Sequence, residues 1–478
     1  MIAQLSATVC RLRSQRLSLS AKVWTVIAIS AFLLQIVAGR HYIAPGPCTW
    51  THLGPLISRD SLRTKSVSSD ILVSEFDVAL KCAVSALTPY TLNLSIIEPE
   101  HTVRLSISCY GGDTNSNDHS TLRPTPIGGT HHHHPHHQAM PFEHLRSMQS
   151  LELDNCKFDR FAADTFRGLV SLKNLTISKA IFSKQEPFVI EPDTFHHVAN
   201  HLESLDLSFN RLDRLPADLF CPFINLHSLN LTGNRLLDLK SFGLIDPSTG
   251  SLCLQELFHL DLSQNNLEFI PETSGVAALR QLHTLNLSSN HISGIAELAF
   301  TSLRRLNVLD LSGNRLRELP SRMFRDSVEL RELHLSGNGL VELPGGLFIG
   351  LSKLLVLDLS SNRITSETIA ADTFADLIRV VVLDLSGNRL RRLPANAFLN
   401  LYSLQSLSLK GNQLETIEDG AFSTLYNLHT LRLDGNQLRQ VSDSLLSGLF
   451  VLSQLHLANN KLETIREDAF KNCTNLQV

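Results

Sequence analysis

The feature that most limits the fold of this chain is a short motif that it repeats. Residues 309–320 read LDLSGNRLRELP, and residues 383–394 read LDLSGNRLRRLP. Residues 357–364 carry the shorter form LDLSSNRI. A single copy cannot bury its own apolar face, so neighbouring copies must stack and share one core. The motif therefore predicts a solenoid that grows along one axis.

The full motif, L-x-x-L-x-L-x-x-N-x-L, occurs eleven times in register. Its asparagines are mostly 24 residues apart, with gaps of 31 after Asn234, 25 after Asn265 and 26 after Asn362. Two weaker copies precede them and carry Cys156 and Ala180 in the Asn position. This pattern resembles the leucine-rich repeat family, which implies an α/β solenoid, a horseshoe with short parallel strands on its concave face. The repeats span residues 142–478, about 13 in all with the last incomplete.

The Asn of each motif is expected to lie inside a turn. In the L-x-L strand alternate side chains point to opposite faces, so the leucines enter the core and the x residues face the concave surface. The Asn amide that follows can bond backbone groups of neighbouring turns. We therefore predict an internal polar ladder. Its members are Asn210, Asn234, Asn265, Asn290, Asn314, Asn338, Asn362, Asn388, Asn412, Asn436 and Asn460.

Phenylalanines recur on the other side of each repeat and predict a buried aromatic spine. They are Phe300, Phe324, Phe348, Phe374, Phe398, Phe422 and Phe470, and Leu446 fills the one vacant position. Each buried Phe or Leu contributes roughly 1.5–3 kcal/mol, which stabilises a stack but not an isolated repeat. The aromatic residues are therefore assigned to the core and not to a ligand cage.

The first 39 residues read as a separate leader. Basic residues precede an apolar run at 23–39, which is shorter than the ~20 residues that span a bilayer. Val37 and Gly39 fit the small side chains of a cleavage site. We predict a signal peptide cleaved after Gly39, with an uncleaved membrane anchor as the alternative. Both deliver the rest of the chain into the secretory pathway.

Delivery outside the cytosol makes N-x-[ST] sequences candidates for glycosylation. Asn230 and Asn286 occupy the outward position of an L-N-L strand, so glycans there would project from the concave sheet. A flat protein partner is then expected at the lateral edges or in the repeats beyond Asn314. The candidates are Asn93, Asn174, Asn230, Asn286 and Asn472.

An oxidising compartment also allows the cysteines to pair. Cys221 lies off the core positions, between Phe220 and Phe223, and Cys253 lies in the expanded 31-residue repeat, just before the strand that starts at Leu257. We predict a disulfide between them. Cys473 takes a leucine position and is expected to be a buried thiol. Cys156 takes the ladder position and is expected to point inward.

Residues 40–141 are expected to form an N-terminal cap, because an open solenoid end would expose apolar core. We predict a second disulfide there, between Cys48 and Cys82, and leave the pairing of Cys109 open. Residues 110–140 are rich in Gly, Pro, Ser and His, which predicts a flexible surface loop. Its run HHHHPHH could bind zinc or nickel adventitiously, but a dedicated site needs fixed geometry. We predict no metal site and no cofactor.

Composition and motifs argue against two other classes. A net charge of −4 and a pI near 6.6 give no basic field, so nucleic acid is not an expected partner. No H-E-x-x-H, G-x-S-x-G or P-loop pattern occurs. The chain is therefore not expected to be an enzyme, and no catalytic residue is assigned.

Several cysteine-bearing segments together resemble a narrower family. They are CTW at Cys48, SEFDVAL before Cys82, IIEPEHTVRLSISC ending at Cys109, LELDNC at Cys156, DLFC at Cys221, SLCL at Cys253 and AFKNCTNLQ around Cys473. In this order they resemble the N-terminal part of the ectodomain of arthropod Toll receptors of the long class that includes Tollo and 18-wheeler. The His-rich loop departs from that pattern.

The resemblance implies a cell-surface receptor of innate-immune or developmental signalling. Such an ectodomain would bind a cystine-knot cytokine of the Spätzle type or pair with another leucine-rich-repeat ectodomain. The membrane span and signalling domain would lie beyond Val478, and we expect the chain to be a truncated part of a longer receptor, or to be secreted if it ends there. Its last repeats are then expected to fray and to associate through that end. The alternative is an adhesion protein of the chaoptin kind, which the sequence downstream would distinguish.

Overall fold

The computed structural model describes residues 48–52, 78–84 and 102–109 and, with short gaps, residues 142–476. The gaps are 143, 157–160, 162, 181–189, 192, 240–243, 247, 442–443, 467–468 and 472. All described residues belong to the compact unit Pro47–Val478. The predicted leader and His-rich loop lie outside the described residues. Within the described ranges no helix has the length and apolar character needed to cross a membrane.

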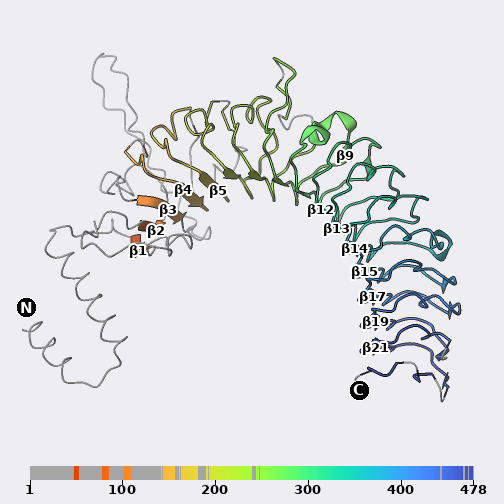
Figure 1. The fold of residues 1–478 in the computed structure, drawn as a ribbon. Helices are drawn as coiled ribbons and strands as arrows, with labels where there is room; N and C mark the ends of the chain where they lie inside the picture. The colour runs from red at the N-terminus through yellow and green to blue at the C-terminus, as the bar shows by residue number, and fades with distance from the viewer. Residues whose placement is uncertain are drawn as a thin grey trace, which may run out of the picture. The chain divides into compact units, whose positions relative to one another are not determined.

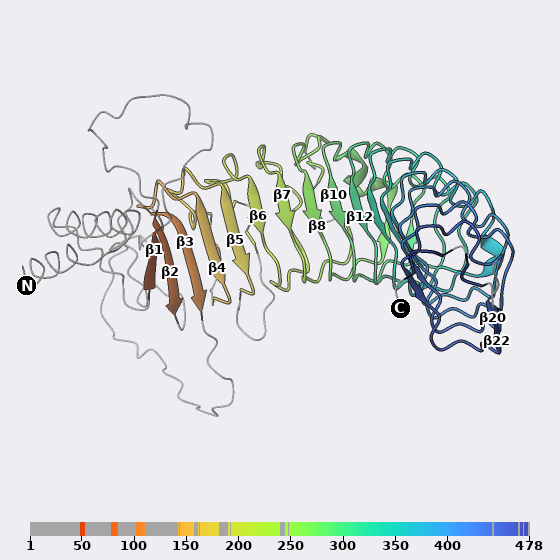
Figure 2. The same cartoon turned by 60° about the horizontal axis from the view of Figure 1, so that its bottom comes forward.

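One long sheet of 16 strands runs through the unit Pro47–Val478 and confirms the predicted solenoid of parallel strands (Figures 1 and 2). All neighbours in it are parallel except β1 and β2, which are antiparallel. The strands that continue into the predicted cap are β1 (Cys48–His52), β2 (Val78–Val84) and β3 (Thr102–Cys109). The sheet therefore extends beyond the first recognisable repeat, because β3 pairs in register with β4.

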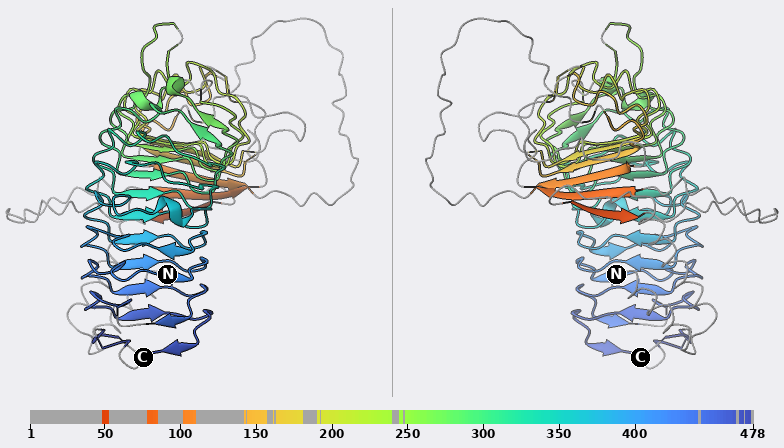
Figure 3. Two further views of the ribbon diagram at one scale, coloured as in Figure 1. Left: turned by 90° about the vertical axis from the view of Figure 1, so that its right-hand side faces the viewer. Right: turned by 90° about the vertical axis from the view of Figure 1, so that its left-hand side faces the viewer.

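The repeats supply the remaining strands of this sheet, mostly three residues long. They are β4 (Ser150–Asp154), β5 (Asn174–Ser178), β6 (Ser204–Asp206), β7 (Ser228–Asn230), β8 (His259–Asp261), β10 (Thr284–Asn286), β12 (Val308–Asp310), β13 (Glu332–His334), β14 (Val356–Asp358), β15 (Val382–Asp384), β17 (Ser406–Ser408), β19 (Thr430–Arg432) and β21 (Gln454–His456). They lie on the inner side of the curved ribbon in Figure 1 and stack one above the next in Figure 3.

The outer side of the repeats is built from turns and very short elements. Three pairs of two-residue strands occur there, β9 (Phe269–Ile270) with β11 (Gly294–Ile295), β16 (Arg392–Leu393) with β18 (Thr416–Ile417), and β20 (Gln440–Val441) with β22 (Thr464–Ile465). The 3-10 helices are η3 (Glu272–Ser274), η4 (Val276–Ala278) and η5 (Ser366–Thr368). The described part contains no α-helix, because a 24-residue period leaves few residues to cross the outer side.

The core consists of leucine columns and a phenylalanine spine. In the typical strand the middle leucine is buried and both neighbours are partly exposed. Successive spine rings from Phe348 to Phe422 stack with centroids 5.9–6.1 Å apart. The spine also extends further toward the N-terminus than predicted, through Phe142, Phe166 and Phe195. The prediction for Phe470 was wrong: its ring is 39% exposed, because no described repeat lies beyond it to cover it.

The ladder asparagines occupy the turns after the strands. The Asn388 amide nitrogen donates to the carbonyl oxygens of Leu359 and Leu385 at 2.9 and 3.0 Å, and its oxygen accepts from the backbone N–H of Ile364. The same arrangement recurs along the solenoid. At the N-terminal end Ala180 takes the place of the Asn, and its own N–H donates to Asn210. Each ladder residue thus joins two consecutive turns.

Candidate functional site

The concave face of the long sheet presents one aligned row of side chains. The last residue of each short strand points outward and lies opposite its counterpart in the next strand. From β6 to β21 the row runs Asp206, Asn230, Asp261, Asn286, Asp310, His334, Asp358, Asp384, Ser408, Arg432 and His456. Because the strands pair in register, these outward side chains form one continuous polar surface.

Carboxylates dominate the middle of this row. Asp310, Asp358 and Asp384 each accept a hydrogen bond from the backbone N–H two residues later, at 2.8–3.0 Å, which holds the carboxylate against the sheet. Among the described residues none of these three takes part in an ion pair. Asp358 and Asp384 are also direct neighbours across β14 and β15. A row of such carboxylates is chemically suited to a basic partner.

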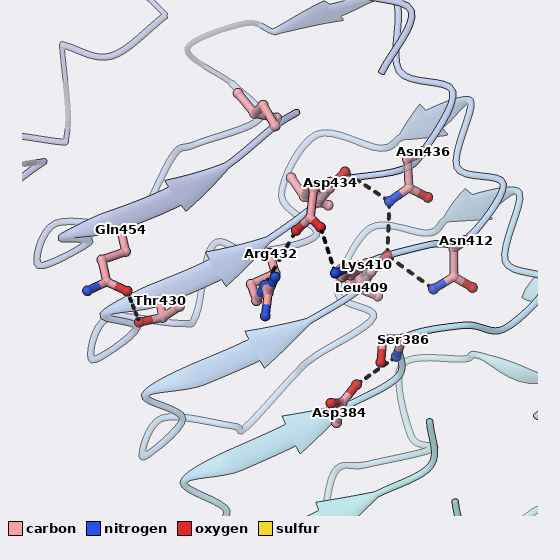
Figure 4. A network of polar contacts seen from close by, with 12 residues as sticks. Asp384, Ser386, Leu409, Lys410, Asn412, Thr430, Arg432, Asp434, Asn436 and Gln454 are labelled. Carbon is pink, nitrogen blue, oxygen red and sulfur yellow. Dashed lines mark hydrogen bonds and ion pairs between the residues drawn. The ribbon is translucent and has the colours of Figure 1, made fainter. Parts of the chain in front are cut away.

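The sign of the charge changes at the C-terminal strands. Lys410 and Arg432 both contact the carboxylate of Asp434, at 3.5 and 3.4 Å, as Figure 4 shows. The Asp434 side chain is only 13% exposed, whereas both cationic side chains remain about half exposed. One carboxylate thus orients two cations in neighbouring repeats. A partner that spans the concave face would need basic groups over the middle and acidic groups over this end.

Two of the predicted glycosylation sites belong to the same row. The Asn230 amide nitrogen donates to Asp206 at 2.9 Å, and that of Asn286 donates to Asp261 at 3.0 Å. Both side chains lie on the concave face, where the motif predicted them. Asn174 is exposed at the start of β5. Asn93 and Asn472 lie outside the described residues.

A disulfide closes the long insertion on the outer side. Cys221 and Cys253, 32 residues apart, are bonded to each other. The loop that they enclose contains Asp246, whose carboxylate accepts hydrogen bonds from the hydroxyls of Ser248 and Thr249. These bonds, that from Ser248 first, lower the pKa of Asp246 to about 2. The disulfide therefore ties the described part of the insertion, residues 244–246 and 248–253, to the solenoid.

The other described cysteines differ in their bonding state. Cys473 is a buried free thiol, and burial raises its pKa above the ordinary value. Cys156 is buried as expected, but it is also disulfide-bonded, which the sequence analysis missed. Its place beside the cysteine-bearing cap was the available signal. In the cap, the antiparallel register places Cys48 opposite Cys82, and a bridge between them stays a prediction.

No part of the described chain assembles three or more His, Cys, Asp or Glu side chains in a group that could hold a metal ion. One open hollow of the described surface is lined by Lys173, His201, Glu203 and His227 on the flank of four repeats. The extended concave face is thus the surface best suited to a macromolecular partner.

Comparisons with known proteins agree with this architecture. The leucine rich repeat family model matches residues 183–236, 280–340, 329–390, 378–438 and 426–478, together more than half of the chain. Toll-like receptor 7 of Drosophila melanogaster is 41% identical over 141 residues, which are 28% of this chain and 10% of that protein. The chain is therefore related to that receptor distantly and over part of its length.

Solved structures of the Drosophila Toll–Spätzle complex share the fold. The glycosylated form is 23% identical, with a TM-score of 0.64 over 84% of this chain and 49% of the Toll chain. A second structure of the complex is 20% identical, with a TM-score of 0.65 over 85% and 52%. The chain thus spans about half of the solved Toll chains and a tenth of Toll-like receptor 7. On its repeats, its ladder and these matches, the chain belongs to the leucine-rich repeat family.

Proposed function

We propose that this chain is the extracellular ligand-binding and receptor-pairing part of a Toll-type cell-surface receptor. The observation that carries the proposal is the 41% identity to Toll-like receptor 7 over 141 residues. The likeness to the Toll chain in its complex with Spätzle supports it at the level of the fold. The chain would act without enzymatic chemistry, in innate-immune or developmental signalling.

The concave face supports a protein ligand rather than a small molecule. A small ligand needs an enclosed, mostly apolar pocket, whereas this face is extended, open and lined by charged groups. Its acidic middle and basic end would orient a protein of opposite charge pattern and speed its association. The Spätzle-type cystine-knot cytokine is the proposed ligand, and the chain would be displayed outside the cell.

The test is a binding measurement with a purified Spätzle-type cystine-knot dimer from the source organism. The secreted chain is immobilised, and binding is followed by surface plasmon resonance at 50, 150 and 500 mM salt. We expect saturable binding that weakens as salt rises, because charges on the concave face contribute. Absence of saturable binding to every such cytokine up to about 50 μM, an affinity near 6 kcal/mol, would contradict the proposal.

A matched pair of variants links the binding to the concave face. Asp358→Asn with Asp384→Asn removes two aligned carboxylates and is expected to weaken binding about tenfold. The control, Asp372→Asn with Asp376→Asn, removes two carboxylates from the outer side of a repeat and should leave the affinity within twofold. Equal loss in both pairs would mean that net charge, and not this face, drives the association.

A further inference from the structure

One turn residue in the N-terminal repeats differs from its counterparts in every other repeat. The residue directly before the ladder asparagine has a positive φ, 54–71°, in all eleven full repeats, from Phe209 to Asn459. Ten of these residues are Gly, Ser, Asn or Gln, and the eleventh is Phe209, with a φ of 59°. The left-handed region is unfavourable for a bulky residue because its Cβ atom crowds the following carbonyl oxygen. A strained residue of this kind points to a function rather than to the needs of the fold.

The ring of Phe209 lies across the next repeat. A Cβ atom built on Gly233 would lie 2.3 Å from Cδ1 of Phe209, so a residue with a side chain at position 233 would collide with the ring. Phe209 is nevertheless 43% exposed. The ring therefore packs on the backbone of Gly233 and still presents apolar surface to the solvent.

Asn230, a predicted glycosylation site, lies beside this ring. The Phe209 N–H donates to the carbonyl oxygen of Thr232 at 2.8 Å, so the turn runs alongside the Asn-Leu-Thr sequence of the site. The side-chain nitrogen of Asn230, which would carry the glycan, donates to Asp206 at 2.9 Å and is thus directed toward the repeat of Phe209. Residues two apart in an extended strand are about 7 Å apart. The first sugars of a glycan on Asn230 would therefore begin close to the ring.

The second concave site, Asn286, has the same backbone geometry without a ring. Its side-chain nitrogen also donates to an aspartate of the preceding strand, at 3.0 Å. In its surroundings Gln264 takes the place of Phe209, and Ser289 takes the place of Gly233. The chain thus contains a matched control for the effect of the ring.

We propose that Phe209 is a contact site for the N-linked glycan of Asn230, with the first N-acetylglucosamine lying on the exposed part of the ring. One face of a pyranose presents mainly C–H groups, which suit the negative face of an aromatic ring. Stacking also removes apolar surface of both groups from water. The contact would hold the glycan over β6 and β7 and offset the strain at Phe209. This inference requires a glycan on Asn230 and is independent of the proposed ligand.

Enzymatic release of the glycans from the folded, secreted chain tests the inference. Peptide N-glycosidase is added to the native protein, and mass spectrometry follows the peptides that contain Asn230 and Asn286. The glycan on Asn230 should be released about fivefold more slowly from the wild type than from Phe209→Gln, which corresponds to about 1 kcal/mol of stacking. Release at Asn286 should be the same in both chains, which shows that the variant is folded. Phe209→Tyr keeps the ring and should keep the slow release.

A transfer variant tests whether the ring is sufficient. Gln264→Phe with Ser289→Gly builds the same pair beside Asn286 and should slow release at that site about fivefold, by the same stacking. Unchanged release at Asn286 in this variant would count against the ring as the contact.

Three results would overturn the inference. They are an unoccupied Asn230 in the secreted wild-type chain, equal release at Asn230 from the wild type and Phe209→Gln, and loss of binding to the Spätzle-type dimer in Phe209→Gln without any change in glycan release. The last would assign the ring to a protein partner. A wild-type chain that binds no such dimer contradicts the proposed ligand only, because the expected release rates do not depend on it.

Discussion

The side-chain nitrogen of Asn362 donates a hydrogen bond to the carbonyl oxygen of Leu335, one repeat earlier, at 2.9 Å. The same nitrogen donates to Leu359 at 3.1 Å, and the side-chain oxygen accepts from the N–H of Leu340 at 3.1 Å. Asn362 is only 6% exposed. One amide thus bonds backbone groups of two consecutive turns that the parallel strands leave without a partner.

Replacing Asn362 with Ala is expected to destabilise the solenoid by about 2 kcal/mol. The buried N–H of Leu340 then loses its partner, whereas the carbonyl oxygens of Leu335 and Leu359 keep the bonds that Asn338 and Asn388 donate. Urea unfolding followed by circular dichroism measures the change. The control is Asn225→Ala, whose amide also bridges two repeats, to the carbonyl of Asn200, but at an exposed site. That change should cost less than about 1 kcal/mol. Similar costs at the two positions would show that the ladder is not a special source of stability.

Ser327 occupies a buried position of the repeat that is leucine in the neighbouring repeats. It is fully buried, and its hydroxyl has no hydrogen-bond partner among the described residues, whereas Leu303 and Leu351 occupy the same position in the flanking repeats. Ser327→Ala removes an unsatisfied buried hydroxyl and should raise the free energy of unfolding by about 1 kcal/mol.

The opposite sign is expected for Thr194→Val. Thr194 is equally buried, but its hydroxyl donates to the carbonyl of Phe161 at 3.2 Å. Removing that donor should lower the free energy of unfolding by about 1 kcal/mol. Destabilisation by Ser327→Ala would show that the Ser327 hydroxyl is hydrogen-bonded in the folded protein.

The disulfide-bonded cysteines and the free thiol should differ in their reactivity. Peptide mapping of the non-reduced protein should recover Cys221 linked to Cys253. Cys473 should resist iodoacetamide in the native chain and react after unfolding, because the thiolate is the reactive form and burial both shields it and raises its pKa.

The raised pKa of Cys473 also predicts a pH dependence. Its contribution to stability is complete below the unfolded pKa and is lost as pH rises toward the folded one. Unfolding midpoints of the native chain should therefore fall in the alkaline range, and Cys473→Ala should reduce that fall. Recovery of Cys473 in a disulfide from folded protein would contradict its assignment to the core.

The Asp246 carboxylate should titrate near pH 2, below ordinary aspartates, because Ser248 and Thr249 donate hydrogen bonds to its charged form. A depressed folded pKa contributes stability above the unfolded pKa and loses it as pH falls through the folded one. The hydrogen bonds from Ser248 and Thr249 to Asp246 should therefore persist at pH 4 and weaken toward pH 2. Carboxyl carbon chemical shifts measured by NMR follow the titration, and a midpoint near 4 would refute it.

Glycans on Asn230 and Asn286 would cover the N-terminal half of the concave face. A glycosylated amide keeps one N–H, so the hydrogen bonds to Asp206 and Asp261 can persist. We expect mass spectrometry to find both sites occupied and ligand binding to use the flanks or the repeats beyond Asn314. Exposed concave substitutions around the two asparagines should then leave the ligand affinity within twofold. If such substitutions abolish binding while those on the edges do not, the expectation is wrong.

The repeat pattern in the sequence was sufficient to predict the solenoid, the asparagine ladder and most of the buried core. A residue's place in the 24-residue period decides whether its side chain points inward, because every strand pairs with the next in the same register. Asn362 and Phe398 could therefore be placed without a structure. The same logic placed Asn230 on the concave face and Cys473 in a leucine column.

Only the tertiary structure decided what the outward residues and the ends of the array do. The period says that Tyr402 and Tyr426 share a position, but their parallel rings at 6.3 Å depend on the offset between repeats and on the side-chain rotamers. The bonded state of Cys156 and the exposure of Phe470 depend on neighbours that no internal period describes. The repeat pattern predicts which side chains are buried because each stacked copy has the same neighbours. Surface side chains and residues of the terminal repeats have different neighbours, so the pattern does not predict their contacts.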